Sequence, residues 1–363
     1  WFDILKQEET TQWIQIDWKW FYNSYAPFDL FWKKLTAFTK RYSSVQYHPE
    51  SVMSINWFEE LRNMILELNQ WENNLTYKFI KRIIDNPWKF SEDEKYMMFE
   101  NIVNKEVSSE ELSEIVSFIK SKQIIKLNLN NSIDICWTWW SNLPRINTST
   151  LTALWLVKEW IKIAKHWNNA STWRFGSFDL IESIWYKVWN NTEEIIKEYE
   201  ENNIAFLHAK ILFPIFKEFS ELRKKYWKPT IFNILWPLLN PSNSDYQIIW
   251  CSDEKNMKLM IETCKLLWRK NVMVVRGEDW LDEVTLSWKT KVYELKNWKI
   301  KQYYISPEDY WFNTVELKEI LSEENEDKIK IAKQIIDWKN MWAYSQLVEL
   351  NKKVAIDFLN KIN

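Results

Sequence analysis

The chain has 363 residues, of which 46% are hydrophobic and 27% charged, and its formal net charge is −2. Acidic and basic residues are interspersed, which indicates neither a nucleic-acid partner nor a membrane surface. We find no apolar run of transmembrane length and no signal peptide, and the length allows two domains. The three cysteines, Cys136, Cys251 and Cys264, have unrelated spacings, which favours reduced thiols in a cytoplasmic protein.

Glycine is nearly absent from this sequence. There are 27 tryptophans and only 2 glycines, whereas a chain of this length ordinarily has about 25 glycines. Tryptophan also stands where turns or helix ends require glycine, as in Asn297-Trp298, Asp279-Trp280, Asp337-Trp338 and Tyr226-Trp227. Some bacterial lineages read the codon UGA as glycine. We therefore hypothesise that most of these tryptophans are glycines in the native protein; the alternative is a truly tryptophan-rich chain.

Residues 1–54 end with the string Val45-Gln-Tyr-His-Pro-Glu-Ser-Val52. It resembles the C-terminal end of a class I glutamine amidotransferase domain, as in anthranilate synthase component II. In that family a histidine activates a cysteine nucleophile and a glutamate orients the histidine. The resemblance implies that His48 is the base and Glu50 its orienting residue. No cysteine stands in the Gly-x-Cys-x-Gly turn of the nucleophile, so we predict a remnant of the domain with an incomplete triad.

Residues 55–125 are predicted to form a helical subdomain. Apolar residues recur every three or four positions in Phe58–Leu68 and Leu75–Ile84. Ser91–Glu94 and Ser108–Glu111 have the spacing of capping boxes that open two further helices. The stretch contains no catalytic motif, so we expect it to serve helix packing.

Residues 126–363 alternate between strand-like and helical stretches. The predicted strands are Ile133–Cys136, Ile161–Ala164, Thr230–Leu235, Gln247–Cys251 and Asn271–Val275, with a hairpin from Val292–Leu295 to Ile300–Ile305. Helices are predicted around residues 151–160, 177–185, 192–201, 205–226 and 254–268. Such alternation predicts an α/β fold with a largely parallel sheet, in which ligands bind at the carboxyl ends of the strands.

Five motifs follow one another near these strand ends when tryptophan is read as glycine. They are Asp134-Ile-Cys-Trp-Thr-Trp-Trp-Ser141, Asn147-Thr-Ser-Thr150, Lys165-His-Trp-Asn168, Phe232-Asn-Ile-Leu-Trp-Pro-Leu-Leu-Asn-Pro241 and Trp280-Leu-Asp-Glu283. In this order they resemble the signatures of anthranilate phosphoribosyltransferase, over roughly residues 55–351. The resemblance implies a helical subdomain plus a mainly parallel α/β subdomain of the nucleoside phosphorylase/phosphoribosyltransferase type, preceded by the partial amidotransferase segment. The second subdomain is C-terminally short for that family.

The resemblance also implies the roles of individual residues. Those assigned to phosphoribosyl pyrophosphate are Trp137, Thr138, Trp139, Trp140, Asn147, Ser149, Thr150 and Lys165. Those assigned to anthranilate are Trp137, His166, Asn168 and Arg223, and those assigned to Mg²⁺ are Ser149, Asp282 and Glu283. These residue types fit: backbone amides of a glycine-rich turn hold phosphate, arginine binds a carboxylate, and Mg²⁺ takes few carboxylates. Without the resemblance, Asp282-Glu283 would be read as a solvated turn, Arg223 as surface charge and His166 as a packed histidine.

The predicted reaction transfers the phosphoribosyl group to anthranilate and releases pyrophosphate, in tryptophan biosynthesis. The implied partners are the two substrates, a second copy of the chain in a homodimer, and anthranilate synthase component I. One alternative is a pyrimidine nucleoside phosphorylase-like enzyme, whose Gly-His-Thr-Gly-Gly-Thr string we do not find. Another is a degenerate, non-catalytic module that binds phosphoribosyl pyrophosphate or serves assembly, because Ser141, Asn169 and Phe213 depart from the family pattern.

Overall fold

The computed structural model describes residues 75–92, 95–96, 99, 106–138, 143–167, 180–181, 186–226, 230–322, 325–337, 339 and 342–360. The chain divides into two compact units, residues 1–72 and 73–363, and every described residue belongs to the second. His48, Glu50 and the boundary predicted at residue 54 lie outside the described residues. They stay predictions.

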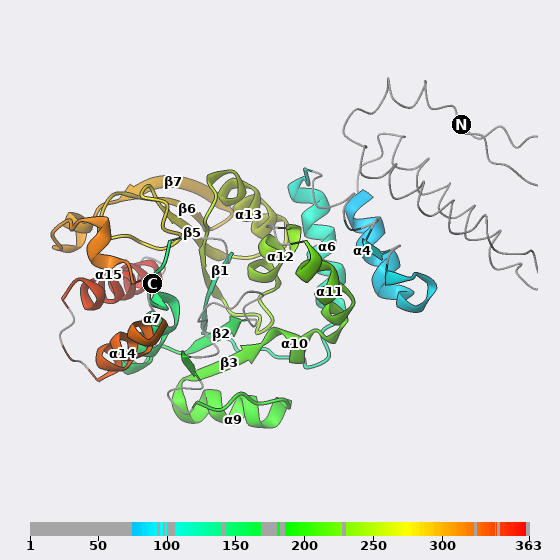
Figure 1. Cartoon of the computed structure of the whole chain (residues 1–363), viewed down its shortest axis with the longest axis horizontal. Coiled ribbons are helices and arrows are strands. Elements are labelled where there is room, and N and C mark those ends of the chain that lie inside the picture. The colour runs from blue at the N-terminus through cyan, green and yellow to red at the C-terminus, as the bar shows by residue number, and fades with distance from the viewer. Residues whose placement is uncertain are drawn as a thin grey trace, which may run out of the picture. The chain divides into compact units, whose positions relative to one another are not determined.

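A seven-stranded sheet forms the centre of the described part, with the spatial order β3-β2-β1-β4-β5-β6-β7 (Figure 1). The strands are β1 Ile133–Trp137, β2 Ile163–Trp167, β3 Ile204–His208, β4 Tyr246–Trp250, β5 Asn271–Gly277, β6 Thr290–Lys296 and β7 Lys299–Ile305. The strands from β3 to β5 in this order are parallel, and β6 and β7 are antiparallel. The predicted mainly parallel α/β fold is confirmed.

Helices cover both faces of this sheet (Figure 1). Helix α7 packs with α14 and α15 on one face, whereas α6, α12 and α13 pack together on the other. The α-helices are α4 Leu75–Asp85, α6 Ser109–Ser121, α7 Thr148–Lys158, α9 Thr192–Asn202, α10 Ala209–Leu212, α11 Lys217–Lys225, α12 Ile231–Leu239, α13 Glu254–Leu266, α14 Asn325–Ile336 and α15 Ala343–Asn360. Short 3₁₀ helices are η1 Pro87–Lys89, η2 Pro214–Phe216, η3 Pro307–Tyr310 and η4 Leu317–Ile320.

The parallel strands are apolar along most of their length because both of their faces are covered. Ile133 and Ile135 of β1 belong to one buried cluster with Leu156 of α7 and Leu347 of α15. The order of the strands reverses between β1 and β4, because the chain leaves β1 toward β2 but later returns to β4 on its other side. Such a switch point leaves a crevice at the carboxyl ends of the two strands, where ligands of open α/β sheets bind.

Two predicted elements are wrong. The run Thr230–Leu235, expected as a strand, lies in helix α12, which Thr230 and Asn233 open with a capping box. A short buried apolar run does not distinguish strand from helix by periodicity, and the cap was the signal to use. The helix expected at 205–226 begins instead as strand β3, paired in parallel with β2. Asn203, left-handed at φ 56°, ends α9 directly before that strand.

The hairpin turn prediction is confirmed, whereas the capping box predicted at Ser108–Glu111 forms only at Ser108, because Glu111 Oε1 accepts from the backbone N–H of Thr76 at 2.6 Å. Ser108 Oγ accepts a hydrogen bond from the backbone N–H of Glu111 at 3.2 Å, which caps α6. Between β6 and β7, Asn297 and Trp298 both have positive φ, as a two-residue hairpin turn of the primed type requires. None of the helices described here combines the length and the hydropathy needed to cross a membrane.

Candidate functional site

The crevice at the switch point contains a cavity of about 730 Å³, within the range of small-molecule sites. Thr138, which directly follows β1, lines it together with Asn233 of α12 and Ser252 after β4. The Thr138 hydroxyl lies 3.2 Å from Ser252 Oγ, and Asn233 Nδ2 donates to the Thr138 carbonyl at 3.3 Å. The loop that begins at Thr138 is therefore tied to both neighbouring elements.

The N-terminus of α7 gathers a second group of polar side chains. Asn147 caps the helix, because its Oδ1 accepts from the backbone N–H of Thr150 at 3.2 Å. Lys165 Nζ donates to Ser149 Oγ and to the Ile135 carbonyl, each at 3.0 Å. Burial lowers the pKa of Lys165 to about 8. A positive helix end with a buried ammonium beside it favours an anion at this point.

Asp282 and Glu283, which we call the carboxylate pair, meet the same helix end. Thr148, the first residue of α7, donates from its hydroxyl to Glu283 Oε1 at 3.1 Å. Arg145, which precedes the helix, pairs through Nη2 with Asp282 Oδ1 and through Nε with Glu283 Oε2 at 3.2 Å. Both carboxylates are buried, with 0% and 1% of their side chains exposed.

The carboxylate pair sets two acidic groups beside one guanidinium in a buried place, which disfavours two negative charges there. Burial raises the pKa of Glu283 to about 8, and the nearby charge of Asp282 adds to the rise, although Arg145 opposes it. Asp282 Oδ2 has no hydrogen-bond partner among the described residues. Buried carboxylate oxygens with an open position are the donors that Mg²⁺ prefers. The donor set thus fits Mg²⁺, although Arg145 contacts the other oxygen of Asp282 and one oxygen of Glu283.

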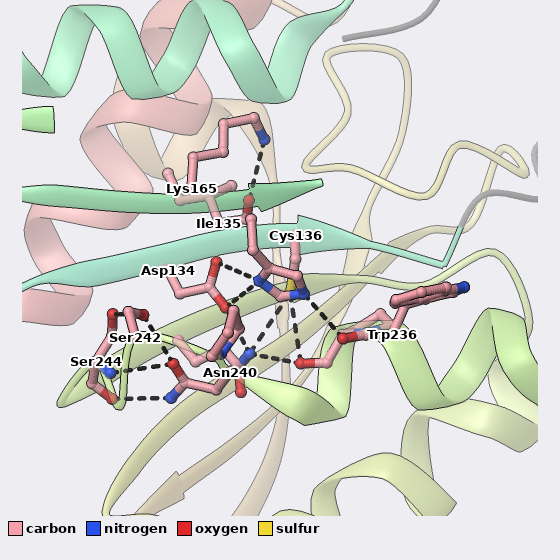
Figure 2. A network of polar contacts seen from close by, with 12 residues as sticks. Asp134, Ile135, Cys136, Lys165, Trp236, Asn240, Ser242 and Ser244 are labelled. Atoms are coloured by element: carbon pink, nitrogen blue, oxygen red, sulfur yellow. Dashed lines mark hydrogen bonds and ion pairs between the residues drawn. The ribbon is translucent and has the colours of Figure 1, made fainter. Parts of the chain in front are cut away.

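A different polar cluster, which we call the sheet network, lies on the opposite face of β1 and β2 and consists of Asp134, His166, Gln247 and Arg269. Lys165 extends away from Asp134 and Trp236 (Figure 2). His166 Nδ1 lies 2.9 Å from Asp134 Oδ2, and its Nε2 lies 2.8 Å from the Trp236 carbonyl.

Gln247 and Arg269 complete the sheet network. Gln247 Nε2 donates to Asp134 Oδ2 at 2.8 Å, and an Arg269 guanidinium N–H donates to Gln247 Oε1. Every member therefore has partners inside the protein, and the network joins the sheet to α12. Cys136 lies beside it as a buried thiol whose pKa burial raises.

The comparisons with known proteins agree on one family. The profile of the glycosyl transferase family, a/b domain, matches residues 129–361. The anthranilate phosphoribosyltransferase of Dictyoglomus turgidum is 32% identical over 254 residues, which cover 70% of this chain and 76% of that protein. That of Caldicellulosiruptor saccharolyticus is 31% identical over 294 residues, covering 80% and 87%.

The chain belongs to the anthranilate phosphoribosyltransferase family, and it is a pentosyltransferase. The fold agrees with solved anthranilate phosphoribosyltransferases. The crystal structure of the enzyme from Thermus thermophilus superposes with a TM-score of 0.71 at 21% identity, covering 80% of this chain and 86% of that one. The Saccharomyces cerevisiae enzyme in complex with PRPP and Mg superposes with a TM-score of 0.66 at 20% identity, covering 78% and 82%.

Arg223, expected from the family to hold the anthranilate carboxylate, lies on α11. Its guanidinium carbon is 5.9 Å from the ring centres of both Phe232 and Trp236 on α12. Burial lowers its pKa to about 10, and it pairs with no carboxylate of the described residues. Such a cation fits a carboxylate ligand.

Other residues expected to bind anthranilate are differently placed. Both ring nitrogens of His166 face protein oxygens, so His166 would meet a ligand through its ring carbons or backbone. Phe213, a departure from the family pattern, is buried and packs edge-on against Phe216. Trp139, Trp140 and Asn168 lie outside the described residues, so their roles stay predictions.

Sequence reasoning missed Arg145 and Asp134. A charged residue inside the apolar strand Ile133–Cys136 was a usable signal for Asp134, because buried charges are nearly always paired. Arg145 gave no such signal, since its partner Asp282 is 137 positions away in the chain.

Proposed function

We propose that this enzyme transfers the phosphoribosyl group of phosphoribosyl pyrophosphate to the amino nitrogen of anthranilate and releases pyrophosphate. The observation that carries the proposal is the gathering of Lys165, Ser149 and the carboxylate pair at the N-terminus of α7. A polyanion is neutralised there by an ammonium and the helix dipole. This site suits a substrate that carries both phosphate and pyrophosphate.

In this proposal the protein positions and neutralises more than it transfers protons. The C1–oxygen bond of the sugar breaks through a cation-like transition state, while negative charge develops on the departing pyrophosphate. Lys165, the backbone from Trp137 to Trp140 and the end of α7 would bind that charge. Arg223 and Asn168 would hold anthranilate by its carboxylate, with its nitrogen directed at C1.

Mg²⁺ belongs to the proposal, with Asp282, Glu283 and Ser149 as the residues that would hold it. Bound Mg²⁺ would add positive charge next to the pyrophosphate oxygens. The open Oδ2 of Asp282 supports this assignment. Yeast relatives crystallised with Mg or with PRPP and Mg are consistent with it.

We also propose that most tryptophans of this chain are glycines in the native protein. Among the described residues, six tryptophans have positive φ, between 41° and 73°: Trp160, Trp268, Trp280, Trp298, Trp311 and Trp342. All six side chains are exposed. Left-handed backbone costs a residue with a Cβ about 1–2 kcal/mol, and glycine avoids that cost. At these six positions the backbone conformation disfavours any residue with a Cβ, and the large apolar side chain of tryptophan is exposed.

Peptide mass spectrometry of the native protein tests this recoding. Digestion should give glycine masses at the six positive-φ positions. Trp155 serves as the comparison within the same spectra. It is buried in a regular helix, and its Nε1 donates to the Ile335 carbonyl at 3.3 Å. Indole masses at the six positions would contradict the proposal.

Four further assignments complete the proposal. We propose a cytoplasmic enzyme, supported by the three buried free thiols. We propose a homodimer, a fusion to the remnant of a glutamine amidotransferase domain, and association with anthranilate synthase component I. Size-exclusion chromatography with light scattering, and co-purification with component I, would test the homodimer and the association.

The function itself is tested by separating binding from turnover in the protein with its native residues. We expect phosphoribosyl pyrophosphate to bind in the presence of Mg²⁺. Anthranilate fluorescence should fall only when phosphoribosyl pyrophosphate and Mg²⁺ are both present. Binding without turnover would favour the non-catalytic module instead. Phosphorolysis of a pyrimidine nucleoside, with no use of anthranilate, would favour the phosphorylase-like alternative.

A further inference from the structure

Arg145 lies just before the N-terminus of α7, and its side chain is directed into the carboxylate pair. It pairs with Asp282 Oδ1 and, through Nε at 3.2 Å, with Glu283 Oε2. Only 7% of the Arg145 side chain is exposed. This contact is therefore an ion cluster inside the site rather than a surface salt bridge.

The cluster has fewer cations than acidic groups. Two carboxylates face one guanidinium, and Thr148 adds only a neutral hydroxyl donor to Glu283. Asp282 Oδ2 has no hydrogen-bond partner among the described residues. The cluster can thus accept more positive charge. However, Arg145 already covers one oxygen of each carboxylate, and a metal ion on those oxygens would be repelled by the guanidinium in a buried site.

We propose that Arg145 is an internal counter-ion of the carboxylate pair, which a divalent metal ion must displace in order to bind. The inference rests on the proposed function for the identity of the metal site. It adds that the Arg145 guanidinium and the metal ion compete for the carboxylate pair. Metal binding alone is therefore weakened by the work of moving Arg145.

The displaced guanidinium of Arg145 could pair with a bound phosphate group. Arg145 is two positions before Asn147, the N-cap of α7, so it stays close to the helix end where Lys165 meets Ser149. Phosphate oxygens bound there would pair with it. Because coupling between two ligands is reciprocal, pyrophosphate should strengthen metal binding, and metal should strengthen pyrophosphate binding.

The test compares Mn²⁺ binding, measured from the electron paramagnetic resonance signal of free Mn²⁺, in the full chain and in Arg145→Gln. We expect Arg145→Gln to bind Mn²⁺ about 10- to 100-fold more tightly without pyrophosphate, the scale of changes next to a metal ligand. Pyrophosphate should raise the Mn²⁺ affinity of the unaltered chain more than that of Arg145→Gln. Equal or weaker Mn²⁺ binding by Arg145→Gln, or no binding by either protein, would overturn the inference.

Lys352→Gln is the matched control. Lys352 is a buried cation that pairs with Glu159 at 2.9 Å and with Glu349 at 3.0 Å, outside the site. Loss of Lys352 should leave the Mn²⁺ affinity unchanged. This control distinguishes the removal of Arg145 from the removal of any buried cation. If Lys352→Gln tightened Mn²⁺ binding equally, the effect would be one of net charge and the inference would fail.

A second measurement needs no folded Arg145→Gln protein. With arginine labelled by ¹⁵N, the Nε–H resonance of Arg145, assigned by its absence in Arg145→Lys, should shift as Mg²⁺ saturates the unaltered chain. A resonance that stays in place at saturating Mg²⁺ would contradict displacement. Neither measurement uses phosphoribosyl transfer, so absence of turnover would refute the proposed function and leave this inference to be decided by metal binding.

Discussion

The sheet network and the carboxylate pair are both buried and both charged, but they are built in opposite ways. In the sheet network, Asp134 is met by His166 and Gln247, and His166 spans to the Trp236 carbonyl. In the carboxylate pair, two adjacent acids share one guanidinium, and Asp282 Oδ2 is left without a hydrogen bond among the described residues. Buried polar groups are ordinarily satisfied, so the unsatisfied cluster is the one that we propose as a ligand site.

The largest expected effect comes from removing one charge of the carboxylate pair. Glu283→Gln should lower kcat/KM about 10²- to 10³-fold, the cost of losing an electrostatic contact in the transition state. Its free energy of unfolding should change little, because the amide replaces a carboxyl group whose charged form burial already disfavours. Enzyme assays and urea unfolding measure the two effects. Glu294→Gln, a buried carboxylate that accepts from Tyr303 at 2.6 Å outside the site, is the control and should keep its activity.

The opposite outcome is expected in the sheet network. Asp134→Ala removes one partner of a buried pair, which should lower the free energy of unfolding by about 3–5 kcal/mol. Mn²⁺ affinity should not change in the fraction that remains folded. As a control, Asp85→Ala breaks the more exposed pairs with Lys81 and Lys122 and should cost about 1 kcal/mol or less. A cost for Asp134→Ala no larger than this control would remove the contrast between the two clusters.

Lys165, at the N-terminal end of α7, should affect substrate binding more than the stability of the fold. Lys165→Met should raise the KM for phosphoribosyl pyrophosphate about 10- to 100-fold, as expected for loss of one charged hydrogen bond. The free energy of unfolding should change less than in Asp134→Ala, because the cost of burying the ammonium disappears with it. Lys162→Met, which removes only the partly exposed pair with Glu200, should leave the KM as it was. A change in kcat alone would point to a different role for Lys165.

A further effect, confined to pH above about 7, is a dependence of stability on pH beside the sheet network. Burial lowers the pKa of Lys120 to about 7, and the charge of Arg269 adds to the shift. Between about pH 7 and the ordinary lysine pKa, the unfolded chain binds more protons than the folded one, so this group makes the protein more stable as pH rises. Below about pH 7 the lysine is charged in both states and the cost of burial is complete.

Urea unfolding at several pH values measures this contribution. Lys120→Met should flatten the rise of stability above about pH 7, whereas Lys258→Met, an exposed lysine on α13, should not. A slope that is identical in Lys120→Met and in the unaltered chain would contradict the assignment.

Several of these features were predictable from local sequence. Strands β1, β4 and β5, the cap at Ser108 and the Asn297-Trp298 hairpin all depend on short-range patterns, and all were predicted. Helix α12 was predicted as a strand because the buried run Thr230–Leu235 has no polar face from which a period could be seen. Long-range pairing explains what remained hidden: Arg145 acts on residues more than a hundred positions away.

The site shows the same division. The motifs located Lys165 within strand β2, Ser149 at the start of α7 and the carboxylate pair after β5. They could not show that His166 faces the protein interior while its neighbour Lys165 faces α7, because that depends on which face of the sheet each helix covers. Composition alone supplied the glycine hypothesis, and the φ angles supplied its structural support.

One measurement tests the central claim most directly. The protein with its native residues is mixed with phosphoribosyl pyrophosphate, anthranilate and Mg²⁺, and the products are identified by mass spectrometry alongside Glu283→Gln. We expect phosphoribosyl-anthranilate and pyrophosphate in equal amounts from the unaltered protein, and far less of both from Glu283→Gln. Intact substrates in the presence of a folded protein that binds phosphoribosyl pyrophosphate would contradict the account.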